Sequence, residues 1–149
     1  MTEAPATPST LPHVATEASD GKEPVTVYAI LGGMAFFDEL VARFYKRVAT
    51  DILLRPMYPD DLNGSKRHLA LFLAQYWGGP TTYHDERGHP RLRMRHAPFV
   101  IGEPERDAWL RHMNAAIESL LDEWDVHPVV EARLVDYMAT AADAMVNMR

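Results

Sequence analysis

The sequence predicts an all-α domain preceded by a disordered N-terminal segment. Four stretches carry apolar side chains at intervals of three and four residues, which is the spacing of amphipathic helices. No stretch alternates apolar and polar residues for long enough to indicate a strand. At 149 residues the chain has the length of a single domain. We therefore expect about five main helices around one core.

Composition and charge exclude several classes of protein. The formal net charge of −6 and the pI of about 5.6 argue against a general nucleic-acid or membrane-surface binder, because both partners are polyanions. No run approaches the ~20 apolar residues that cross a bilayer, and the N-terminus lacks the features of a secretory signal. The absence of cysteine excludes disulfides and thiolate zinc ligands, which fits a cytoplasmic location.

Residues 1–24 have the composition of a disordered tail. They contain four prolines among threonine, serine, alanine and acidic residues, and Leu11 and Val14 are their only large aliphatic side chains. Such a segment buries too little apolar area to offset the entropy lost on ordering. We therefore place the folded domain at residues 25–149.

The first periodic helix follows the flexible pair Gly32-Gly33. Its apolar face consists of Phe37, Leu40, Val41, Phe44, Tyr45 and Val48. Because Tyr45 lies on this face, its hydroxyl needs a buried partner. Residues 55–61 contain two prolines with Tyr58 between them, and this punctuation predicts a connecting loop.

The second periodic helix opens near Asn63 or Ser65, either of which could cap it. It ends at the segment 77–80, which reads Trp-Gly-Gly-Pro. Its buried face carries Ser65, Leu69, Phe72, Leu73 and Tyr76. Residues 80–90 show little helical pattern, and they are too many for an ordinary turn between helices, so we expect a long loop there.

A short run after that loop carries His96. Pro98 disfavours helical geometry at the preceding residue, so any helical turn that contains His96 must end there. Two longer helices follow, and they begin near Gly102 and at Pro128. Their apolar faces carry Trp109, Met113, Ala116 and Leu120 in the first and Val130, Leu134, Tyr137, Met138, Ala141 and Met145 in the second.

His96 is the candidate metal ligand of the chain. None of the seven histidines lies four residues from another, and no HExxH motif occurs, so a zinc site built from protein ligands alone is not expected. If His96 binds a metal, a cofactor must supply the equatorial ligands, as in haem proteins. The alternative is a histidine with a purely structural role.

Four arginines surround this histidine with no acidic residue between them: Arg87, Arg91, Arg93 and Arg95. The planar guanidinium recognises carboxylates such as haem propionates. A solvated basic face explains the same pattern. Phosphate or RNA binding is a third interpretation, which the overall negative charge and the lack of a flanking aromatic platform weaken.

Tyr45, Tyr58 and Trp109 are three expected buried or half-buried donors with no obvious polar partners in the sequence. Each of them taken singly is more often a core residue than a ligand contact. Together they predict that something polar in the interior accepts their hydrogen bonds.

Six motifs in fixed order resemble the group II truncated haemoglobins. They are Gly32-Gly33, Arg43-Phe44-Tyr45, Met57-Tyr58-Pro59, Gln75-Tyr76-Trp77-Gly78-Gly79-Pro80, the segment from Gly88 to Phe99, and the segment from Glu105 to Leu110. The resemblance covers roughly residues 26–147 and leaves out the tail. The ordered set is far harder to meet by chance than any one motif.

The resemblance implies a two-over-two α-helical sandwich that binds haem b, with His96 as the proximal iron ligand and Arg93 paired with a propionate. It places Tyr45, Tyr58 and Trp109 in the distal set that stabilises a bound ligand. Ser65 stands where larger globins carry a distal histidine. The expected haem contacts are Ser65, Leu69, Phe72, Tyr83, Leu92, Arg93, His96, Phe99, Ile101 and Met113.

The expected function is tight binding of dioxygen and other diatomic gases, in oxygen binding or transport with a redox role such as nitric oxide or peroxide detoxification. Each donor bond of ~1–3 kcal/mol slows release about five- to 150-fold. A nitric oxide dioxygenase or peroxidase-like enzyme would need a separate reductase, because the chain has no GxGxxG motif. The sequence leaves two questions undecided: whether the protein forms a homodimer, and whether it is instead a haem-free helical interaction or sensor domain.

Overall fold

The computed structural model describes residues 25–149, and the predicted disordered tail of residues 1–24 lies outside them. Helices and connecting segments make up the described part, which contains no strand. The helices are α1 (Val27–Ile30), α2 (Met34–Val48), the 3-10 helix η2 (Arg55–Met57), α3 (Asn63–Tyr76), α4 (Thr82–Arg87), α5 (Leu92–His96), α6 (Glu103–Trp124) and α7 (Pro128–Met145). The predicted all-α fold class is confirmed.

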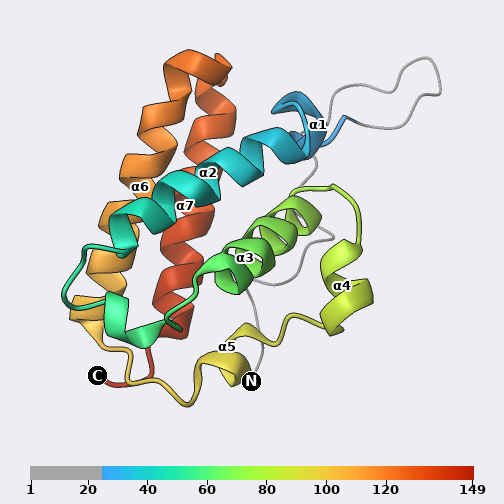
Figure 1. Cartoon of the computed structure of the whole chain (residues 1–149). Coiled ribbons are helices and arrows are strands. Elements are labelled where there is room, and N and C mark those ends of the chain that lie inside the picture. The colour runs from blue at the N-terminus through green and yellow to red at the C-terminus, as the bar shows by residue number, and fades with distance from the viewer. Residues whose placement is uncertain (1–24) are drawn as a thin grey trace.

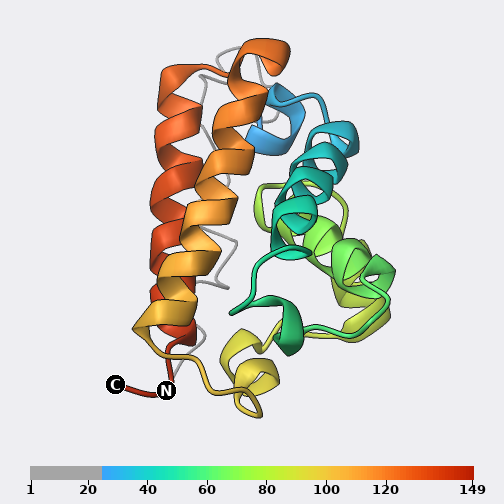
Figure 2. The same ribbon diagram turned by 60° about the vertical axis from the view of Figure 1, so that its left-hand side comes forward.

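Two pairs of helices form the sandwich. The long helices α6 and α7 lie side by side, and α2 packs both on α3 and on α6 (Figure 1). In the second view the α6–α7 pair stands on one side of the molecule and α2 and α3 stand on the other (Figure 2). The short helix α5 packs against α7. This is the two-over-two arrangement that the resemblance to group II truncated haemoglobins implies.

The predicted apolar face of α2 forms the centre of the core. Phe36, Phe37, Leu40, Phe44 and Val48 are fully buried. Burial of each such side chain contributes roughly 1.5–3 kcal/mol, which is ample to dock the helix between its two neighbours. The core therefore holds α2 in place and fixes the direction of any side chain that it presents to the interior.

The start of α3 differs from the prediction. Neither Asn63 nor Ser65 caps the helix, because the N-cap position is Leu62 and it makes no side-chain capping bond. The Asp61 carboxylate instead accepts a hydrogen bond of 2.9 Å from the Asn63 amide. The loop before it also contains the 3-10 helix η2, which begins with Arg55 and Pro56.

The predicted long loop of residues 80–90 contains a helix. Residues 82–87 form α4, in which Tyr83 is buried and its ring lies edge-on to Phe72, with centroids 5.6 Å apart. A helix of six residues is too short to show a period in the sequence. Tertiary burial of one aromatic side chain therefore decides the conformation of this segment.

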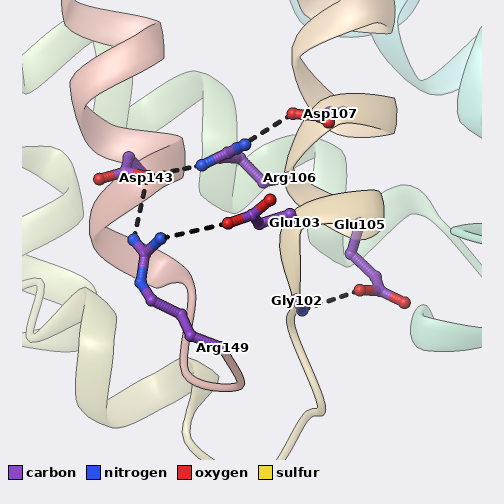
Figure 3. A network of polar contacts seen from close by, with 7 residues as sticks. All are labelled: Gly102, Glu103, Glu105, Arg106, Asp107, Asp143 and Arg149. Carbon is purple, nitrogen blue, oxygen red and sulfur yellow. Dashed lines mark hydrogen bonds and ion pairs between the residues drawn. The ribbon is translucent and has the colours of Figure 1, made fainter.

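The predicted beginning of α6 is confirmed, and ion pairs connect it to the end of α7. Glu105 accepts a hydrogen bond of 2.8 Å from the Gly102 amide, which caps the helix (Figure 3). Arg106 of α6 and Arg149 after α7 both bind Asp143, at 2.8 and 3.1 Å. Exposed pairs of this kind contribute little stability singly. They do hold the chain after α7 against the start of α6.

Candidate functional site

Three separate segments bring Tyr45, Tyr58 and Trp109 together. Tyr45 projects from α2, Tyr58 follows η2, and Trp109 lies in α6. The rings of Tyr45 and Tyr58 meet edge to face with centroids 5.4 Å apart, and Phe44 packs on Trp109 at 5.2 Å. We call Tyr45, Tyr58, Trp109 and the neighbouring Ser65 the distal cluster.

Hydrogen bonds connect the members of the distal cluster. The Ser65 hydroxyl donates to Tyr45, the Tyr45 hydroxyl donates to Tyr58, and the Trp109 indole also donates to Tyr58. The Tyr58 oxygen thus accepts two bonds, and its own proton can go to a further acceptor. The three donors therefore have partners, namely one another, which corrects the expectation that they lack them.

Burial keeps both phenols of the distal cluster protonated. It raises the pKa of Tyr58 to about 12, and it raises the pKa of Tyr45 well above its usual range. Both groups are therefore neutral hydroxyls at physiological pH. A cluster of neutral donors suits a ligand that carries partial negative charge.

His96 is held in one tautomer at the end of α5. Its Nδ1 atom lies 2.6 Å from the Leu92 carbonyl oxygen, one turn earlier in the same helix. Because a carbonyl can only accept, Nδ1 must carry the proton, and Nε2 then carries the lone pair that a metal needs. The residues present therefore fit an axial ligand of haem iron. No group of three histidine, cysteine or acidic residues in positions 25–149 could hold a metal ion without such a cofactor.

Asn147 holds the turn that follows His96. Its Nδ2 atom donates to the carbonyl oxygens of His96 and Phe99, at 3.4 and 2.9 Å, and its Oδ1 accepts from the Ile101 amide at 2.9 Å. Asn147 lies 51 positions after His96, so no local pattern could reveal this contact. The segment that follows α7 therefore positions the turn beside the candidate ligand.

The four arginines around His96 do not form one solvated face. Arg95 donates to the carbonyl oxygens of Pro90 and Arg87, at 2.7 and 2.9 Å, and so shapes the loop before α5. Arg87 donates to His68 at 3.0 Å, and its guanidinium lies 5.8 Å from the centre of the Tyr83 ring. Arg93 is exposed. Arg87 and Arg95 thus shape the segment around α5, and the pairing of Arg93 with a propionate stays a prediction.

The other predicted haem contacts come from α3, α4, α5, α6 and the segment between the last two. Phe72, Tyr83, Ile101 and Met113 are buried, whereas Ser65, Leu69 and Leu92 are half-buried. Phe99 is 41% exposed. Their common role in holding haem stays a prediction.

Comparison with known proteins shows the family of the chain. The model of the bacterial-like globin family matches residues 26–147. The chain belongs to this family. This bacterial-like globin is 42% identical over 102 residues to the group 2 truncated haemoglobin YjbI of Bacillus subtilis, a match that covers 68% of this chain and 77% of that protein. The predicted resemblance to group II truncated haemoglobins is confirmed.

Solved structures of related globins share the fold. A haemoglobin from the thermophilic phototrophic bacterium Chloroflexus aurantiacus is 51% identical, with a TM-score of 0.77, and the match covers 84% of this globin and 99% of that chain. A truncated oxygen-avid haemoglobin from Bacillus subtilis is 39% identical, with a TM-score of 0.73, over 81% of this globin and 98% of that chain.

Membership of the globin family implies a haem cofactor and a diatomic gas as ligand. His96, with its Nε2 lone pair available, agrees with such a cofactor. No helix among residues 25–149 is long and apolar enough to cross a membrane.

The stability of this globin should fall when the pH drops below about 6.5, the pKa of histidine in an unfolded chain. Burial, followed by the charges of Arg87 and Arg95, lowers the pKa of His68 in the folded state. Just below pH 6.5 the unfolded chain therefore binds a proton that the folded chain does not, and unfolding becomes easier.

Urea unfolding at pH 7.5 and 5.5 measures this contribution, with His68→Gln as the comparison. The glutamine side chain can still accept the Arg87 hydrogen bond but does not titrate. We expect a smaller loss of unfolding free energy on acidification in the variant. Equal losses in the two proteins would show that His68 does not contribute.

Proposed function

We propose that this globin holds haem b with His96 as proximal ligand and binds dioxygen tightly. The observation that carries the proposal is the distal cluster, in which Tyr45 of α2 and Trp109 of α6 both donate a hydrogen bond to Tyr58. Haem supplies an iron centre at which diatomic gases bind reversibly. The relative described as a truncated oxygen-avid haemoglobin supports the choice of dioxygen.

The side chains of this globin would perform three tasks. His96 holds the metal through Nε2 while the Leu92 carbonyl fixes its ring. Tyr58 donates its free proton to a ligand that carries partial negative charge, while Tyr45 and Trp109 donate to the Tyr58 oxygen and so hold and polarise its hydroxyl. Arg93 is proposed to bind a propionate, since a guanidinium suits a carboxylate.

Slow release favours a redox role over delivery. If each distal donor bond is worth ~1–3 kcal/mol, loss of the ligand slows about five- to 150-fold per bond. We therefore propose nitric oxide or peroxide detoxification, for which a separate reductase must supply electrons. Repeated consumption of nitric oxide in the presence of a reductant tests this role, and consumption limited to one equivalent contradicts it.

Phenylalanine at position 45 or 109 should speed oxygen release. Tyr45→Phe and Trp109→Phe each remove one donor from the distal cluster, so we expect stopped-flow dissociation rates about fivefold or more above those of the unmodified protein. Tyr137→Phe is the matched control, because the Tyr137 hydroxyl is buried in the core without a hydrogen-bond partner.

Two outcomes would contradict the proposed function. Unchanged oxygen dissociation rates in both variants would show that Tyr45 and Trp109 do not stabilise the bound ligand. A folded protein that stays colourless after titration with haem would favour the haem-free interaction or sensor domain instead.

A further inference from the structure

A polar network lies on the same segments as the distal cluster and has no part in the function described so far. At its centre is His112 of α6, which is 8% exposed. The His112 Nδ1 atom lies 3.0 Å from Nε of Arg47, and its Nε2 atom lies 2.6 Å from Oδ2 of Asp51. We call Arg47, His112 and Asp51 the His112 network.

The partners of His112 determine where its proton lies. The Arg47 Nε–H donates to Nδ1, so Nδ1 must be unprotonated and Nε2 must carry the ring proton. Nε2–H then donates to Asp51, and this bond is the main reason why the pKa of Asp51 is lowered. Arg111 adds a longer contact of 3.7 Å to the same carboxylate oxygen. His112 thus uses both ring nitrogens: Nδ1 accepts from Arg47, and Nε2 donates to Asp51.

Asp51 carries the connection into the turn after α2. Its Oδ1 atom accepts hydrogen bonds of 2.8 Å from the amides of both Leu53 and Leu54. Leu54 directly precedes η2, and η2 leads into Tyr58. The Asp51 carboxylate therefore fixes the turn at Leu53 and Leu54, which leads through η2 to Tyr58.

The His112 network joins the same three segments that carry the distal donors. Arg47 lies two residues after Tyr45 in α2, Asp51 organises the turn that leads to Tyr58, and His112 lies three residues after Trp109 in α6. The mutual geometry of the donors depends on how these segments are held. Apolar packing alone is not directional, whereas hydrogen bonds have a preferred length and angle.

We propose that His112 is a positioning residue for the distal cluster. By holding Arg47 on one side and Asp51 on the other, it keeps α2, the turn before η2 and α6 in the register in which Tyr45 and Trp109 hold Tyr58 toward the ligand. This inference rests on the proposed role of Tyr45, Tyr58 and Trp109. It assigns His112 no contact with the ligand itself.

Two substitutions at His112 test whether its hydrogen bonds to Arg47 and Asp51, rather than its volume, position the distal cluster. In His112→Gln the amide oxygen can accept from Arg47 and the amide nitrogen can donate to Asp51, so both bonds are kept. In His112→Leu both are lost. We expect oxygen dissociation about fivefold or more faster in the leucine variant and close to that of the unmodified protein in the glutamine variant.

A spectroscopic readout tests the geometry without any turnover. Carbon monoxide is the probe, and its infrared stretching band reports the hydrogen bonds around it. The glutamine variant should keep the band of the unmodified protein, whereas the leucine variant should shift or split it. A leucine variant that melts at a lower temperature but keeps both the band and the dissociation rate would show a purely structural role and would overturn the proposal.

Arg47→Met provides a second test should His112→Leu fail to fold, because Arg47 lies at the surface and its loss leaves the His112–Asp51 bond in place. Its matched control is Arg43→Met. Arg43 also ties α2 to α6, through Ser119 and Glu123, but it does not reach the turn before η2. We expect faster oxygen release and an altered carbon monoxide band in Arg47→Met, and lower stability alone in Arg43→Met. Equal effects of the two arginine variants on oxygen release would overturn the proposal.

Parallel measurement of Trp109→Phe distinguishes the two possible failures. If Trp109→Phe speeds release but the His112 and Arg47 variants do not, the positioning role is wrong and the proposed function stands. If none of these variants changes release, the assignment of the distal donors is itself wrong.

Discussion

Replacement of His96 by alanine should abolish the haem spectrum of this globin. His96 is the proposed axial ligand, and the bond from its Nδ1 to the Leu92 carbonyl leaves its Nε2 available for a metal. We expect loss of the wild-type ferrous and ferric absorption bands and rapid transfer of haem to a scavenger. Absorption spectra of the variant after full haem loading measure this effect.

Two comparisons make the His96 test specific. His84→Ala removes an exposed histidine from α4 and should leave the spectra unchanged. In His96→Gly, added imidazole should restore a spectrum close to that of the unmodified protein, because it replaces the missing ring. Unaltered spectra in His96→Ala would show that another residue binds the iron.

Replacement of Gly78 by alanine should destabilise the fold severely. Gly78 has φ +100°, and an added Cβ would lie 2.5 Å from Cβ of Thr26. That threonine cannot move freely, because its hydroxyl caps α1 by accepting from the Ala29 amide. Backbone strain and overpacking together should cost about 2–5 kcal/mol of unfolding free energy, which urea denaturation measures.

Substitutions at two other glycines distinguish backbone strain from overpacking as the cause of the lower unfolding free energy. Gly88 has φ +78° with nothing within 4 Å of an added Cβ, so Gly88→Ala should show the strain alone. Gly64 lies in α3 with open space around it, and Gly64→Ala should be neutral or slightly stabilising. If Gly78→Ala costs no more than Gly88→Ala, the contact with Thr26 is not the reason.

Local signals predicted the main helices and the candidate ligand. The apolar period of α2 is visible in the sequence because that helix is long enough to repeat. Gly78 predicted the end of α3, because its positive φ releases the backbone directly. The predicted end of α5 beside Pro98 is found at His96, but for another reason than the one predicted: Ala97 keeps helical dihedral angles (φ −56°, ψ −34°), and Pro98 has no amide to extend the helix. Such effects act over one or two residues and need no knowledge of the rest of the fold.

The same local signals did not predict the short helix α4 or the cap of α3. The helix α4 has too few residues for a period, and burial of Tyr83 against Phe72 decides it. At the start of α3 several polar side chains compete, and Asp61 rather than Asn63 or Ser65 makes the bond. Which of these side chains accepts from a free backbone amide depends on the direction of the chain just before α3.

The sequence by itself determined the helical fold class, the place of His96 at a helix end and the types of donor available for a distal site. Only the tertiary structure decided which groups meet. Tyr45, Tyr58 and Trp109 bond to one another, Asn147 holds the turn after His96, and His112 joins Arg47 to Asp51. These contacts connect residues far apart in the chain, so they depend on the packing of the helices rather than on any local preference.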